Sequence, residues 1–103
     1  MSRHFVGAIN EFEPQKVRVV RVAGERLCVV LHEEKFYAFE DRCSHDDGPL
    51  GGGSLEGCQI ECPRHGARFD IRTGRVTAPP AMTPIETYTV DLEQEQVYVN
   101  LPD

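Results

Sequence analysis

Two short segments place cysteine and histidine at spacings that suit metal ligands. The first is Cys43-Ser44-His45, and the second, after sixteen intervening residues, is Cys62-Pro63-Arg64-His65. Each segment supplies one sulfur and one imidazole nitrogen, so each of two loops could give one ligand to each of two adjacent metals. The pattern therefore indicates a binuclear centre held by two similar loops.

Two other uses of these side chains stay open at this point. Two cysteines and two histidines could bind one zinc ion in a structural module, although such modules usually place like ligands together, as C-x2-4-C and H-x3-5-H. The four cysteines of the chain could also form two disulfides. Because no export signal follows Met1 and no apolar run approaches about 20 residues, we expect reduced thiols, a cytoplasmic location and no membrane contact.

Length and net charge limit the kinds of partner that the chain can have. With 103 residues the chain fits one domain, residues 1–103, and we expect a monomer. It has 17 acidic and 11 basic residues, and the resulting formal charge of -6 repels nucleic acid and anionic membranes. Basic surfaces of other proteins are the expected complement.

The residue pattern predicts an all-β chain of antiparallel hairpins, and no stretch has the period of a convincing helix. Strands are expected over 4–9, 17–21, 27–31, 36–39, 59–61, 67–71, 75–77, 85–92 and 96–101. A loop is expected over 48–54, which is rich in glycine. Another is expected over 78–84, where three prolines exclude a helix interior or a central strand.

Three further residues of metal-binding types are interpreted as structural. Cys28 lies inside a continuous apolar run, so it is expected in the core. His32 adjoins a charged link between two strands and is expected in a solvated turn. Cys58 shares strand parity with Ile60 and Cys62, so it either packs beside the centre or acts as an alternative ligand, and packing is favoured.

The spacing C-x-H, sixteen residues, C-x-x-H resembles the Rieske family, whose [2Fe-2S] cluster has two cysteines on one iron and two histidines on the other. The stretch Cys62-Pro63-Arg64-His65-Gly66-Ala67-Arg68-Phe69-Asp70, then Thr73-Gly74 and Pro79-Pro80, follows the order of that family. The resemblance covers nearly the whole chain. It implies stacked antiparallel sheets with a cluster-binding part at about 41–82, where two ligand loops form one tip.

The resemblance also implies which residue holds which iron. Cys43 and Cys62 would ligate the inner iron, and His45 and His65 would ligate the outer, solvent-facing iron. The formal charges of two ferric ions, two sulfides and two thiolates cancel, so this centre accepts an electron more readily than a cluster with four cysteines.

Departures from the family pattern predict a low reduction potential. High-potential members carry disulfide cysteines at the positions of Gly48 and Arg64, and hydroxyl side chains at the positions of Ala67 and Phe69. Those hydroxyls stabilise the reduced cluster by donating hydrogen bonds, and both are missing from this sequence.

Two features of the ligand loops leave alternatives open. The glycines of 48–54 either form a linker only or bring backbone amides close to the cluster sulfurs. Arg64 is either a plain exposed arginine or pairs with Asp46 or Asp47 on the opposite loop, where it would tune cluster charge or docking.

Length and missing motifs favour a carrier over an enzyme. A catalytic oxygenase subunit needs a second domain with mononuclear iron, and no G-x-G-x-x-G fingerprint indicates a flavin or nicotinamide site. The resemblance implies a one-electron ferredoxin between a flavin-dependent NAD(P)H reductase and the terminal oxygenase of a ring-hydroxylating system. The alternatives are an electron donor in another pathway, a protein similar to the nitrite reductase small subunit, and the zinc module.

Overall fold

The computed structural model describes residues 1–102, which form three antiparallel sheets and one short 3-10 helix, η1 (Ile9–Glu11). The first sheet has the order β1 (Ser2–Ala8), β11 (Gln96–Leu101), β10 (Val90–Glu93). The second has the order β2 (Arg18–Val22), β3 (Glu25–His32), β4 (Lys35–Glu40), β9 (Thr87–Tyr88). The third has the order β5 (Ser54–Glu56), β6 (Gln59–Glu61), β7 (Arg68–Asp70), β8 (Val76–Ala78). The expected all-β class is confirmed.

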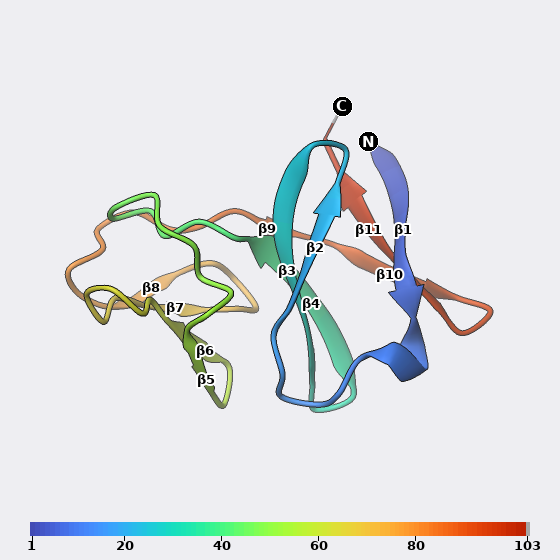
Figure 1. The fold of residues 1–103 in the computed structure, drawn as a ribbon, viewed down its shortest axis with the longest axis horizontal. Coiled ribbons are helices and arrows are strands. Elements are labelled where there is room, and N and C mark those ends of the chain that lie inside the picture. Colours follow the sequence, from blue (N-terminus) through green and yellow to red (C-terminus); the bar gives the residue numbers. More distant parts are fainter. Residues whose placement is uncertain (103) are drawn as a thin grey trace.

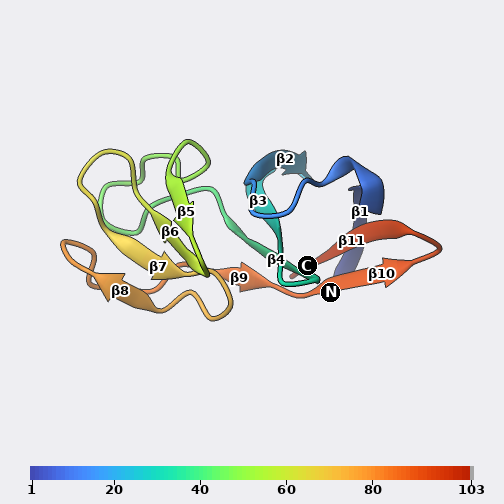
Figure 2. The ribbon, with the colours of Figure 1, turned by 90° about the horizontal axis from the view of Figure 1, so that it is seen from below.

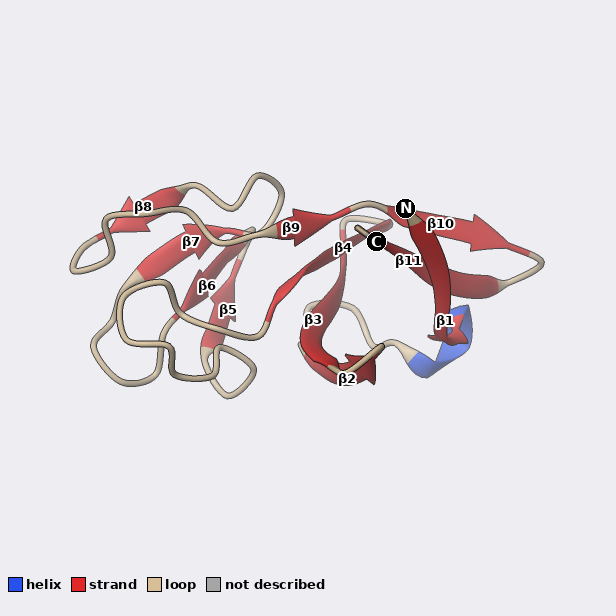
Figure 3. Cartoon of the chain, turned by 90° about the horizontal axis from the view of Figure 1, so that it is seen from above, coloured by secondary structure: helices blue, strands red, loops and turns tan. Residues whose placement is uncertain are grey.

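The third sheet lies at one end of the molecule, and the first two sheets lie toward the other end (Figure 1, Figure 2). In the chain it is inserted between β4 and β9, which pair with each other through Ala38 with Tyr88 and Phe39 with Thr87. The chain therefore leaves the second sheet and returns to it at neighbouring strands (Figure 3).

Strand β3 is buried on both of its faces. Leu27 and Val29 pack into one core with side chains of the first sheet, whereas Cys28 and Val30 pack into another with side chains around the third sheet. This explains why residues 27–31 form a continuous apolar run rather than an alternating one. Cys28 is 0% exposed, so its predicted place in the core is confirmed.

The structure corrects one expected strand. The hairpin over 17–21 and 27–31 is found as β2 and β3, but the single strand expected over 85–92 is wrong. Residues 85–86 lie in a loop, β9 pairs with β4, and β10 pairs with β11. Two strands form because the chain here passes from the second sheet to the first, and one straight strand cannot follow both.

The solvated turn expected at His32 is also wrong. His32 is the last residue of β3 and is only 9% exposed. Its Nδ1 contacts the Oε1 of Gln15, and its Nε2 lies 3.2 Å from the Oε1 of Glu33. The turn consists of Glu33 and Glu34, which both have positive φ, so the strand continues one residue further than expected.

Candidate metal centre

The first predicted ligand segment forms a tight loop closed by its own backbone. The N–H of Cys43 donates to the carbonyl of Gly48 (2.7 Å), and the N–H of Asp47 donates to the carbonyl of Cys43 (2.8 Å). The hydroxyl of Ser44 donates to the carbonyl of Thr83 (2.5 Å), which attaches the proline-rich loop to this one.

The second segment repeats the same two hydrogen bonds. The N–H of Cys62 donates to the carbonyl of Ala67 (2.7 Å), and the N–H of Gly66 donates to the carbonyl of Cys62 (3.1 Å). Gly66 and Asp47 occupy equivalent places in the two loops and both have left-handed backbone, with φ of 77° and 63°. The two loops are thus alike in backbone although their histidines stand at different spacings from the cysteine.

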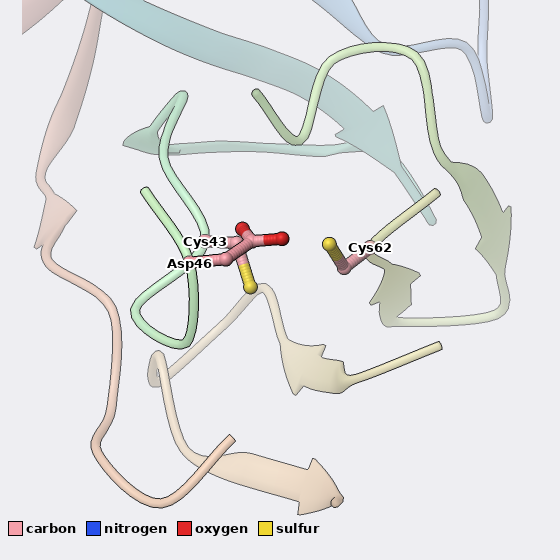
Figure 4. A group of neighbouring side chains, drawn as sticks. All are labelled: Cys43, Asp46 and Cys62. Carbon is pink, nitrogen blue, oxygen red and sulfur yellow. The ribbon is translucent and has the colours of Figure 1, made fainter. Parts of the chain in front are cut away.

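The four predicted side chains are brought together. The sulfurs of Cys43 and Cys62 and a carboxylate oxygen of Asp46 lie within 4.8 Å of one another (Figure 4). A ring nitrogen of His45, one of His65 and an oxygen of Asp46 form a second such group, and the two rings meet edge to face with centroids 5.2 Å apart. Both thiols are 0% exposed, whereas both imidazoles lie at the surface.

The thiol of Cys43 is held in its neutral form by its surroundings. Burial raises its pKa, and the adjacent Cys62 raises it further, while the backbone N–H groups of His45 and Asp46 favour the thiolate and act in the opposite direction. A cation placed beside the sulfur would overcome the cost of burial, because metal coordination deprotonates a thiol.

Asp46 lies beside all four predicted ligands, which the sequence pattern does not indicate. The backbone N–H of Gly48 donates to its Oδ1 (2.9 Å) and lowers the pKa of its carboxyl. Its Oδ2 is buried and accepts no well-aligned hydrogen bond from the described residues, although the Nδ1 of His65 is 3.2 Å away. Two buried sulfurs and two imidazole nitrogens gathered from neighbouring loops are the donor types that hold an iron–sulfur cluster with mixed cysteine and histidine ligation, so the residues fit such a cluster.

Arg64 makes the contact proposed for it from the sequence. Its Nε lies 3.5 Å from the Oδ2 of Asp46, whereas Asp47 pairs with Arg42 instead. A Cβ on Gly48 would lie only 2.9 Å from the Cδ of Arg64, so the absence of a side chain at residue 48 lets Arg64 lie across the first loop. Whether this pair tunes the cluster stays a prediction.

The glycine-rich loop uses several of its amides within the protein. The N–H groups of Leu50 (2.8 Å) and Gly51 (2.7 Å) donate to the Oδ1 of Asp41, and the N–H of Gly53 donates to the carbonyl of Leu50 (2.9 Å). These three amides are therefore engaged with protein oxygens rather than pointed at sulfur. Cys58 is outside both groups of donors found among residues 1–102 and packs, partly buried, against the core around the two ligand cysteines.

Comparison with known proteins gives the family. A model of the Rieske [2Fe-2S] domain matches residues 2–89. The ferredoxin CarAc of Metapseudomonas resinovorans is 37% identical over 95 residues, which cover 91% of this chain and 89% of that protein. The ferredoxin component of the naphthalene 1,2-dioxygenase system of Pseudomonas aeruginosa is 37% identical over 94 residues, covering 91% and 90%.

A solved structure agrees with these sequence matches. A chain in the complex of reduced oxygenase and oxidized ferredoxin in carbazole 1,9a-dioxygenase superposes with a TM-score of 0.88 at 36% identity, covering 94% of this chain and 91% of that chain. The relatives are ferredoxin components, which carry electrons rather than transform a substrate. The chain therefore belongs to the Rieske [2Fe-2S] family and is an electron-carrying ferredoxin with one Rieske-type [2Fe-2S] cluster.

Proposed function

We propose that Cys43 and Cys62 ligate the buried iron of the cluster and that His45 and His65 ligate the exposed iron. The observation that carries this proposal is the difference in burial, because both thiols are enclosed and both imidazoles reach the surface. We further propose a single domain whose cluster-binding part spans about 41–82, the segment that holds all four ligands and the third sheet.

When bound, the cluster takes up and releases one electron. The chain surrounds the sulfur side of the site with apolar groups, since Leu50, Ile60 and Phe69 are each 0% exposed in the core that contains the two cysteines. Water is kept from that side, while the ring edges of His45 and His65 stay open. This arrangement directs a partner protein to the imidazole edge.

The partners are proposed from the relatives. One similar chain belongs to a complex of oxygenase with ferredoxin, and other relatives are components of dioxygenase systems. We therefore propose that this chain accepts an electron from a flavin-containing NAD(P)H reductase and delivers it to a terminal oxygenase of aromatic catabolism, in the cytoplasm. Within residues 1–102 no helix is long and apolar enough to cross a membrane.

The test begins with composition. Purified protein should contain iron and acid-labile sulfide in equal amounts and show a low-average-g electron paramagnetic resonance signal after dithionite. His45→Ala and His65→Ala should each abolish that signal, whereas His4→Ala, on β1 away from the site, should leave it intact. A colourless protein with one zinc ion per chain would overturn the proposal.

The proposed partners have a separate test. The reduced protein should transfer electrons to a purified ring-hydroxylating oxygenase in stopped flow, and the oxidised protein should be reduced by NADH only when a flavin-containing ferredoxin reductase is added. A loaded protein that does neither would keep its cluster but belong to another pathway.

A further inference from the structure

Asp41 is a buried carboxylate at the base of the first ligand loop. Its side chain is only 3% exposed. Its Oδ1 accepts hydrogen bonds from the N–H groups of Leu50 (2.8 Å) and Gly51 (2.7 Å) and from the thiol of Cys28 (3.5 Å). Its Oδ2 accepts a hydrogen bond from the Nε of Arg26 (3.1 Å). A carboxylate with this many donors is fully satisfied, in accord with its burial.

These donors join three parts of the molecule. Arg26 and Cys28 belong to β3, and the N–H of Asp41 itself donates to the carbonyl of Arg26 (3.0 Å). Leu50 and Gly51 lie at the far end of the loop that begins after Asp41. The carboxylate therefore closes residues 41–51 into a ring, and this ring contains two of the proposed cluster ligands.

The far end of this ring has little room to move. A Cβ on Gly51 would lie 2.3 Å from the Cγ2 of Val19 on β2 and 3.3 Å from the Oδ1 of Asp41. Residue 51 thus fits between an edge strand and the buried carboxylate. The loop is held against the second sheet on one side and by Asp41 on the other.

The two charges of the Asp41–Arg26 pair differ in exposure. The Arg26 side chain is 42% exposed, whereas that of Asp41 is 3% exposed. Water therefore screens the positive charge more than the negative one, and the pair presents a net negative potential to the protein interior. A fixed negative charge near a redox centre disfavours the state that carries one more electron.

We propose that Asp41 is a positioning residue of the redox centre, which fixes the first ligand loop and lowers the reduction potential. The inference rests on the proposed ligands Cys43 and His45. Loop closure and charge are separable, because an asparagine oxygen can still accept from the amides of Leu50 and Gly51 while its amide group carries no charge.

Three variants separate these two effects. Asp41→Asn should keep iron and sulfide near the wild-type content and shift the midpoint potential upward. Arg26→Gln, which removes the positive charge of the pair, should shift the midpoint potential downward. This shift should be smaller than that of Asp41→Asn, because Arg26 is partly exposed. Asp41→Ala should also lose the loop closure, and cluster absorbance should decay at least about tenfold faster, since hydrogen bonds to a charged group are individually strong.

Asp91→Asn is the matched control, because it removes the same charge from exposed β10 in the first sheet. Its potential should equal that of the wild type. Equal potentials in Asp41→Asn and Asp91→Asn, or shifts of the same sign in Asp41→Asn and Arg26→Gln, would overturn the electrostatic role. Wild-type cluster lifetime in Asp41→Ala would overturn the loop role. Wild-type protein without iron would instead refute the ligand assignment on which the inference rests.

Discussion

Gly53 faces the backbone of Glu61 so closely that a Cβ on residue 53 would lie 1.9 Å from the carbonyl oxygen of Glu61. Gly53 ends the glycine-rich loop, and Glu61 directly precedes the ligand Cys62. This contact therefore sets how near the end of the glycine-rich loop can come to the residue that precedes the second ligand segment.

Gly53→Ala is expected to push the end of the glycine-rich loop away from Glu61 and to disturb the strand that leads to Cys62. Because the obstacle is backbone, we expect a loss of about 3 kcal/mol in stability and a lower iron content. Gly52→Ala is the matched control, since a Cβ at residue 52 meets nothing within 4 Å. Thermal unfolding and iron analysis of both variants measure the difference, and similar values for the two would contradict this account.

The two cysteines near the second ligand segment should behave differently. Cys62→Ser should lose the cluster, because residue 62 is one of the two buried sulfurs of the site. Cys58→Ser should keep full iron and sulfide, because Cys58 only packs against the core. Loss of iron in Cys58→Ser would contradict this expectation and would indicate that Cys58 is an alternative ligand.

The midpoint potential should lie near the lower end of the Rieske range, about -150 mV, because Ala67 and Phe69 offer no hydroxyl. Both side chains are 0% exposed in the core around the ligand cysteines. Ala67→Ser should therefore raise the potential by supplying a donor, while Ala38→Ser, in the other core, should not. Spectroelectrochemistry gives both values, and a wild-type midpoint above about +100 mV would be inconsistent with the expectation.

Acid should weaken the turn between β7 and β8. The side chain of Arg72 donates to Asp70 (3.1 and 3.0 Å) and lowers its pKa, as does the N–H of residue 72 (2.9 Å). A carboxyl with a lowered folded pKa stabilises the fold above its unfolded pKa of about 3.9, and this contribution is lost as the pH falls through the folded pKa.

Asp70→Asn should therefore lower the melting temperature at pH 7 by a difference that shrinks as the pH approaches 3. The contribution is about 1 kcal/mol or less, because the Arg72 side chain is 52% exposed. Circular dichroism melts of both proteins across this range provide the measurement. A difference that stays constant with pH would rule out the ion pair as its cause.

The hairpin turn between β10 and β11 offers a gain in stability. Gln94 and Glu95 have φ of 51° and 64°, which these residues adopt at a cost and which Asn-Gly adopts readily. The double substitution Gln94→Asn and Glu95→Gly should raise stability by about 1 kcal/mol. The hydrogen bond that the turn accepts, from the N–H of Ile9 to the backbone carbonyl of residue 95 (2.9 Å), does not depend on the side chain and is retained. An unchanged melting temperature would show that the native turn is not strained.

The fold could largely be predicted because local patterns determine most of it. The turn residues Ala23 and Gly24 and the apolar run that follows locate β2 and β3 correctly. The division of residues 85–92 into β9 and β10 could not be predicted, since alternating polar and apolar residues are equally typical of a strand in the first sheet and in the second. His32 was misplaced because its contact with Gln15 joins residues distant in the sequence.

The site shows the same limit. Four ligands of two residue types, cysteine and histidine, at short spacing indicate a metal. The sequence does not show that Asp46 lies beside all four, nor that Asp41 reaches across its loop to Leu50 and Gly51. Acidic residues near a loop are usually solvated, so only the three-dimensional closure distinguishes these two from Asp47, which pairs with the exposed Arg42.

The neighbouring positions of β4 and β9 have a consequence for protein engineering. Because both ends of residues 41–86 meet the rest of the molecule at one hydrogen-bonded pair of strands, this segment can be exchanged for that of a relative without lengthening the chain. The graft must match the side chains on which it rests, chiefly Cys28, Val30 and Phe39. It must also keep the contacts of Asp41 with Arg26 and of Gly51 with Val19. Recognition of a redox partner could thereby be transplanted onto an unchanged scaffold.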